Sequence, residues 1–439
     1  MAITRRQLLA GVGGAAGAHV LAPTIVGRGM AFGATSADPS TSRRNRVLVV
    51  FQQGGNDGLN TVIPTGDVRG APRYSVYRKV RPSIGYAPGA TLPLNRGADV
   101  DHKMGLNAQL KTVHKLYGQG RVAIVQGVDY PKHNYSHFES TDIWESGEPG
   151  QAPDSGWLGR HLDRAGIGDG ELRGLGIGYQ LPLILTGKEQ RGVEIASIAA
   201  THFADGTGAT ADPRHAAFAG FGNYPGSEPL RAFAGKQARA TVELVDYLRK
   251  VPVPKAQNSQ LLNDVLAART LLEQDIGVEC AFVVQSGYDT HTGERQQHET
   301  LLTELDQAIE ALYYGTANGA SLGVGAMKPQ VASRLVVMTI SEFGRRIGEN
   351  GSGAGAGTDH GAAAPVFLIG PTGAGSTGRR LVAGLHGDHS KMGTTALPAD
   401  NLAMTTDLRG VYQAVLQNWL RDPDPLYDHA RKYVGGLFS

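Results

Sequence analysis

The stretch Val47-Leu48-Val49-Val50-Phe51 decides the fold, and Gln-Gln-Gly-Gly-Asn-Asp-Gly follows it at residues 52–58. A short, uninterrupted apolar run rich in Val is typical of a parallel strand that is buried on both faces. Similar runs occur at residues 281–284 and 335–340, and helical patterns separate them. The sequence therefore predicts an α/β fold: a mostly parallel sheet flanked by helices, with these three runs at its centre.

Residue types that bind metals are concentrated beside these runs. Tyr-Asp-Thr-His at 288–291 follows the second run, and Ser-Glu-Phe-Gly-Arg-Arg at 341–346 follows the third. Thr-Asp-His-Gly at 358–361 comes shortly before a fourth apolar run, residues 366–369. Open α/β sheets bind ligands outside the carboxyl ends of their strands. Carboxylates and imidazoles that converge at this edge predict a metal site and hydrolytic chemistry.

The rest of the chain alternates between strand and helix patterns. Residues 182–272 are mostly helical and lack groups of this kind, which predicts a helical cap inserted into the α/β domain. Further strands are predicted at 122–125, 175–177 and 183–185, and helices at 106–117, 137–144, 157–165, 228–250, 260–276, 296–314 and 408–420, the last with Asp407 as N-cap.

The N-terminus predicts where the protein works. Thr-Arg-Arg-Gln-Leu-Leu at residues 4–9 is a twin-arginine motif, a weakly apolar stretch follows at 10–26, and Thr-Ser-Ala at 35–37 offers a cleavage site. A short membrane anchor is the alternative, but the stretch is too short and too rich in Gly for a span. We expect residues 1–37 to be a signal peptide and residues 38–439 to be the mature domain, exported to the periplasm or the extracellular space.

Composition excludes several classes of protein. The formal net charge of the 439-residue chain is +2, and removal of the three arginines in residues 1–37 changes it to −1, so nucleic acid is not an expected partner. No later stretch contains about 20 apolar residues, so no stable membrane span is expected after signal cleavage. Cys280 is the one cysteine, which rules out an intrachain disulfide, and it lacks the Cys-x-Pro/Ser-x-Arg context of a formylglycine sulfatase.

Five motifs occur in order along the chain. They are Phe-Gln-Gln-Gly-Gly-Asn-Asp-Gly-Leu-Asn at 51–60, Ser-His-Phe-Glu-Ser-Thr-Asp-Ile-Trp at 136–144, Gly-Tyr-Asp-Thr-His at 287–291, Ser-Glu-Phe-Gly-Arg at 341–345 and Thr-Asp-His-Gly at 358–361. Over nearly the whole mature chain they resemble the bacterial exported family called domain of unknown function 1501. That family in turn resembles the alkaline phosphatase and sulfatase superfamily, which implies an alkaline-phosphatase-like fold and leaves the substrate open.

The resemblance also implies a set of site residues. One metal would be held by Asp57, Asp359 and His360, and a second by Asp289 and His291 with either His386 or His389. Glu342 resembles an acidic residue that serves an additional metal, Ser136 takes the place of the nucleophile, and Arg345 or Arg346 could hold the anionic oxygens of a substrate. Ser136 could equally be a helix N-cap, and His133 and His137 are interpreted as supporting or surface residues.

These residues predict a cofactor and a reaction. Oxygen and imidazole ligands suit divalent ions such as Zn, Mn, Mg or Ca, and two ions about 4 Å apart would clamp an in-line displacement. The expected protein is an exported metal-dependent hydrolase of phosphate or sulfate esters, including esters on a carbohydrate or a lipid, with a serine or a metal-bound hydroxide as nucleophile. The alternative is a non-catalytic secreted or envelope binding protein on the same fold.

Overall fold

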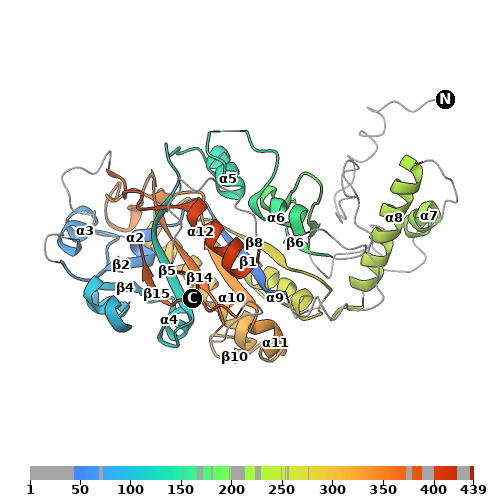
Figure 1. The fold of residues 1–439 in the computed structure, drawn as a ribbon. Coiled ribbons are helices and arrows are strands. Elements are labelled where there is room, and N and C mark those ends of the chain that lie inside the picture. The colour runs from blue at the N-terminus through green and yellow to red at the C-terminus, as the bar shows by residue number, and fades with distance from the viewer. Residues whose placement is uncertain are drawn as a thin grey trace.

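The computed structural model describes residues 44–68, 73–150, 152–165, 172–178, 181–196, 198, 213–222, 229–248, 250–252, 254, 257–274, 276–371, 378–387, 400–422 and 436–439. The predicted signal peptide lies outside these residues. Nine described strands form the main sheet in the order β15-β5-β14-β11-β1-β8-β6-β7, with β16 beside β5 (Figure 1). Within the described ranges, every helix is too short or too polar to span a bilayer.

The centre of the sheet is the predicted one. Strand β1 (Arg46–Gln53) lies between β11 (Leu335–Ile340) and β8 (Cys280–Ser286), and it is parallel to both. All residues of β1 except the last are buried, as an uninterrupted Val-rich run requires. The mostly parallel α/β sheet predicted from the sequence is therefore confirmed.

One strand runs against the others. Strand β14 (Ala364–Ile369) pairs antiparallel with β11 on one side and with β5 (Val122–Asp129) on the other. The remaining pairs in the main sheet are parallel. Because of this reversal, β14 begins at the edge where the parallel strands end. The segment that precedes β14 therefore lies at the same edge as the segments that follow β1, β8 and β11.

Helices cover both faces of the sheet (Figure 1). Leu48 and Val50 of β1 point into a core shared with α4 (Lys111–Gly118), α9 (Gln260–Glu273) and α10 (Glu294–Tyr314). Val47, Val49 and Phe51 point into the opposite core, which is shared with α5 (His137–Ser146), α6 (Trp157–Ala165) and α12 (Leu408–Ala414). Alternate side chains of one strand thus anchor both layers, as expected for the period of two in a strand. Buried Cys280 belongs to the second core.

Some local predictions were wrong. Residues 106–117 were predicted to be one helix, but Met104–Asn107 forms β4 of a small sheet with β2 (Val62–Pro64) and β3 (Thr91–Pro93), and the helix begins only at Lys111. Residues 183–185 form a 3-10 turn and not a strand. At residues 106–107, pairing of β4 with β2 and β3 overrides the local helical pattern. Asp407 does cap α12, which continues as a π turn over Val415–Trp419.

Only part of the predicted helical cap is separate from the α/β core. Strand β7 (Val193–Ile195) pairs with β6 (Gly174–Ile177), and α9 packs against the sheet, so both belong to the α/β core. Helices α7 (Pro213–Gly222) and α8 (Pro229–Leu248) pack against each other and are the part to which the cap prediction still applies.

The other described elements are short, and several of them shape the loops at the site: α2 (Gly58–Thr61), α3 (Tyr74–Val80), η2 (Pro88–Ala90), η3 (Gly97–His102), η4 (Leu183–Leu185), β9 (Thr316–Ala317), β10 (Ala320–Ser321), α11 (Pro329–Ala332), β12 (Gly344–Arg345), η5 (Gly353–Gly355), β13 (His360–Gly361), β15 (Gly384–His386) and β16 (Thr406–Asp407).

Candidate metal centre

Arg345 holds together the loops at the carboxyl edge of the sheet. Its side chain is fully buried, and Nη2 donates to the carbonyls of Gly54 and Tyr288 and to Oδ1 of Asp289, the last at 2.7 Å. Its other nitrogens donate to the carbonyls of Gly55 and Thr358, at 2.8 and 2.9 Å. The loops that follow β1 and β8 and the loop that precedes β14 are thus tied to one guanidinium. We correct its predicted role: Arg345 positions the site, because every nitrogen that could reach a substrate oxygen is already bound to the protein.

Close contact between these loops explains one glycine of the first motif. Gly54 has φ of +118°, and a Cβ atom there would lie 2.3 Å from the backbone nitrogen of Asp289. An L side chain is therefore excluded by both conformation and space. Gly54 allows the loop after β1 to lie directly against the loop after β8.

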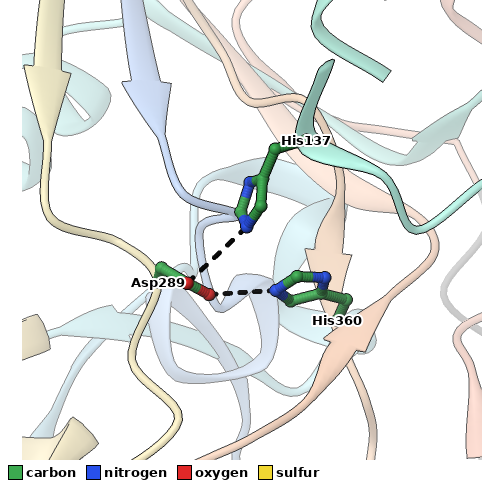
Figure 2. A group of neighbouring side chains, drawn as sticks. All are labelled: His137, Asp289 and His360. Atoms are coloured by element: carbon green, nitrogen blue, oxygen red, sulfur yellow. Dashed lines mark hydrogen bonds and ion pairs between the residues drawn. The ribbon is translucent and has the colours of Figure 1, made fainter. Parts of the chain in front are cut away.

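Three side chains from three separate segments face one another at this edge (Figure 2). His360 Nε2 lies 3.0 Å from Oδ1 of Asp289, and His137 Nε2 lies 3.6 Å from its Oδ2. One ligand atom from each of these three residues falls within 4.8 Å of the others, and among the described residues this is the group that could hold a metal ion. The side chains of His137 and Asp289 remain 36% and 47% exposed, so the cluster is open to solvent.

His291 is a fourth member of this cluster. Its Nε2 lies 3.0 Å from Oδ1 of Asp289 and 3.0 Å from Nε2 of His360. Its Nδ1 lies 3.2 Å from Oδ1 of Asp359, which also accepts a hydrogen bond from Asn350. The predicted residues Asp289, His291, Asp359 and His360 therefore do converge.

The imidazoles share an arrangement that suits a bound cation. Nδ1 of His360 lies 2.9 Å from the carbonyl oxygen of Tyr135, and Nδ1 of His137 lies 2.9 Å from Oε1 of Glu342. When each Nδ1 donates to its oxygen, each Nε2 presents a lone pair toward the Asp289 carboxylate. Histidines that bind metals commonly donate their other ring N–H to such an oxygen. The donor set thus fits a divalent ion of the zinc or manganese type.

The charge of Asp289 also suits a ligand of a divalent ion. Burial by itself raises the pKa of this carboxyl group, but the hydrogen bond from Arg345 and its charge, together with the neighbouring His360 and His291, lower the pKa to about 2. The carboxylate is therefore ionised at neutral pH and is available as an anionic ligand.

Asp57 does not join the cluster. Its carboxylate forms a two-point ion pair with Arg81, Nη1 to Oδ2 at 2.5 Å and Nη2 to Oδ1 at 3.0 Å, and both side chains are completely buried. Burial raises the pKa of Asp57, but Arg81, Glu294 and His298 lower it to about 2. The prediction that Asp57 binds a metal is therefore revised, because an arginine already occupies both of its oxygens.

The other predicted ligands have mixed outcomes. Glu342 is fully buried; its Oε1 accepts from the Gly54 backbone nitrogen at 2.7 Å and faces His137, so it orients a ligand. His386 does not reach the cluster. It pairs with Val125, which lies four residues before the end of β5 and therefore about 13 Å short of the edge. Its Nε2 faces the carbonyl oxygen of Val382. His389 lies outside the described residues.

Ser136 caps α5, as one of its two interpretations predicts. Its Oγ accepts from the backbone nitrogen of Glu139 at 3.5 Å, and the residue is exposed. Its neighbours on both sides touch the cluster, Tyr135 through its carbonyl and His137 through its ring. The sequence pattern around His137 predicts a supporting or surface residue. Its place in the first turn of a helix beside the candidate nucleophile was the signal that could have identified it as a ligand.

Comparison with known proteins identifies the family. The model of the family described as "Protein of unknown function (DUF1501)" matches residues 44–378, so the chain belongs to this family. No curated protein matches the chain in sequence. Among solved structures it is similar to the crystal structure of PsFucS1 sulfatase from Pseudoalteromonas sp., with 11% identity over 88% of this chain and 70% of that chain and a TM-score of 0.32. A likeness this slight carries no argument about the site.

Proposed function

We propose that this chain is an exported, metal-dependent hydrolase of phosphate or sulfate esters. The observation that carries the proposal is the convergence of three imidazole Nε2 atoms on the ionised carboxylate of Asp289, in a cluster that solvent can reach. When each Nδ1 donates to its oxygen acceptor, the Nε2 lone pairs and the Asp289 carboxylate can bind one cation together. The twin-arginine motif at residues 4–9 supports export.

The residues divide into ligands and supports. His137, Asp289, His291 and His360 would hold the ion, while Glu342, Asp359 and the Tyr135 carbonyl orient the imidazoles. When bound, the ion would supply positive charge to the oxygens of an anionic ester and to the attacking oxygen.

Ser136 is the proposed nucleophile in one version of the mechanism. Its hydroxyl is exposed at the N-terminus of a ten-residue helix, directly before the ligand His137. The backbone N–H groups of a helix N-terminus favour an anion, so an ester phosphate or sulfate placed there would be stabilised. In the other version water attacks and Ser136 only caps the helix.

Metal content and ester turnover test the proposal together. We expect the purified mature protein to contain a transition metal and to hydrolyse at least one of an aryl phosphate, a phosphodiester and an aryl sulfate. Asp289→Asn should lose the metal and reduce turnover by a factor on the order of a thousand, while exposed Asp101→Asn serves as the matched control. Metal binding without turnover of any ester in the panel would favour the secreted binding protein.

Ser136→Ala separates the two versions of the mechanism. If Ser136 is the nucleophile, turnover should fall by a factor on the order of a thousand while metal content persists. If it is only an N-cap, the variant should lose about 1 kcal/mol of stability and keep its turnover. Ser136→Thr keeps the cap and a hydroxyl, and it is the matched control for stability.

A further inference from the structure

The environment of Asp57 does not fit a metal ion, although the family resemblance places one there. We propose that the guanidinium of Arg81 is a built-in cation in place of a second metal, so that the chain binds one ion per molecule, at the cluster of His137, Asp289, His291 and His360. This inference rests on the proposed metal centre and specifies its stoichiometry.

The donors around Asp57 leave no place for a metal ion. Both oxygens of Asp57 accept from Arg81, and Oδ1 also accepts from the backbone nitrogen of Leu59 at 3.2 Å. The carboxylate therefore acts as the N-cap of α2 and as one half of a forked ion pair. An ion could bind Asp57 only by displacing these donors, and no exposed oxygen of Asp57 is left for it.

Arg81 is itself fixed in place by backbone carbonyls. Its Nε donates to the carbonyl of Ile347 at 2.7 Å, and its Nη2 also donates to the carbonyl of Arg346 at 2.7 Å. The guanidinium thereby links Asp57, which follows β1, to residues 346–347, which follow β11. A metal ion bound between these two loops would make the same connection. Displacing the guanidinium would strand a fully buried cation, which is strongly unfavourable.

The charges around Asp57 are balanced without a metal ion. Arg81 cancels the charge of Asp57, and Glu294, a buried acid, interacts with Asp57. Burial first, and then the charge of Asp57, raise the pKa of Glu294 well above its usual value, which disfavours its ionised form. Buried His298 has its pKa lowered to about 4, mainly by burial, and is neutral. A second carboxylate ligand for a dication is therefore disfavoured in the pocket around Asp57.

The open cluster differs in each of these respects. Its imidazole Nε2 atoms surround the carboxylate of Asp289. The guanidinium of Arg345 contacts only one of the two oxygens of this carboxylate. Among the residues that the structure describes, it is the group in which three ligand atoms lie within reach of a common ion.

Metal stoichiometry tests the inference directly. The mature protein would be stripped with a chelator, reloaded with Zn²⁺, passed through a desalting column and analysed by elemental mass spectrometry, with a calorimetric titration as a second readout. We expect one Zn²⁺ per wild-type chain. Asp57→Asn should keep that ion, whereas Asp289→Asn should lose it. Arg81→Lys, which retains a cation beside Asp57, should also keep it, and this variant decides the matter if Asp57→Asn does not fold.

The contradicting outcomes are distinct. Two tightly bound ions per wild-type chain, or the loss of one ion in Asp57→Asn, would overturn the inference and leave the proposed hydrolase standing. A wild-type chain that binds no Zn²⁺, Mn²⁺ or Ca²⁺ would overturn both.

Discussion

The two ends of strand β8 carry charged clusters that have similar residue types but differ in their exposure to solvent. At the amino end, Glu279 directly precedes the strand and contacts His161 and Arg173. At the carboxyl end, Asp289 follows the strand and contacts histidines and Arg345. Both groups contain a carboxylate with imidazole and guanidinium partners, so residue types alone do not distinguish them.

The clusters differ in the burial of their side chains and in how many of their charged atoms already have protein partners. In the amino-end cluster, Nδ1 of His161 lies 2.9 Å from Asp422, and Nε2 of His161 lies 3.2 Å from Glu279. Asp422 also pairs with Arg164. The side chains of His161, Glu279 and Asp422 are at most 4% exposed. Each carboxylate there has protein cations around it, so that cluster is complete. The side chains of the carboxyl-end cluster are partly exposed, and its arginine, Arg345, contacts only one oxygen of Asp289. This difference separates a structural network from a candidate metal centre.

Removing His137 should break the open cluster and leave the closed one intact. We expect His137→Ala to weaken Zn²⁺ binding by at least about 100-fold and to reduce ester turnover by a factor on the order of a thousand. Calorimetric titration and steady-state kinetics measure the two effects. Exposed His102→Ala is the matched control, and unchanged metal affinity in His137→Ala would remove this residue from the site.

Removing Glu279 should lower the stability of the fold and leave metal binding unchanged. Glu279→Gln removes the carboxylate that pairs with buried Arg173 and His161, so the free energy of unfolding should fall by about 3–5 kcal/mol. Urea denaturation gives this value, and metal stoichiometry should not change. Glu189→Gln, at an exposed glutamate, is the control. If Glu279→Gln lost metal while keeping its stability, the two clusters would not be independent.

The pH dependence of stability sharpens the comparison. Burial lowers the pKa of His161, but hydrogen bonds and charges from Asp422 and Glu279 raise it above its usual value. A raised folded pKa means that protonated His161 stabilises the fold below its unfolded pKa, about 6.5, and that this contribution is lost as the pH rises through the folded pKa. Wild type should therefore lose more stability than His161→Gln between pH 6.5 and 9 in urea unfolding. Parallel profiles for the two proteins would contradict this.

The smallest expected effect concerns the rim of the open cluster. Phe138 follows His137 in α5 and is 88% exposed, whereas no exposed aromatic residue is part of the closed cluster. Phe138→Ser should change stability by less than about 0.5 kcal/mol and raise KM for an aryl ester roughly two- to tenfold, because an aromatic contact is lost. An alkyl ester serves as the control substrate. An equal change in KM for both esters would rule out contact with the aromatic leaving group.

The sequence by itself determined the architecture and much of the cluster. Uninterrupted Val-rich runs favour strands buried on both faces, which predicts that β1, β8 and β11 are central, as the structure confirms. Polar residues that follow such strands must lie at one edge, and Asp289 and His291 do. These conclusions depend on local patterns and on a rule that applies to every parallel sheet.

Only the tertiary structure decided which charges meet. Nothing local to Asp57 indicates that Arg81 saturates both of its oxygens, because that pairing depends on how the segment containing α3 folds back onto α2. His137 and Asp289 are 152 positions apart, and the orientation of the histidine depends on buried Glu342. His360 reaches the carboxyl edge because β14 runs antiparallel. Side-chain partners, unlike strand patterns, are set by contacts between distant segments, and these contacts separate a saturated ion pair from an open ligand.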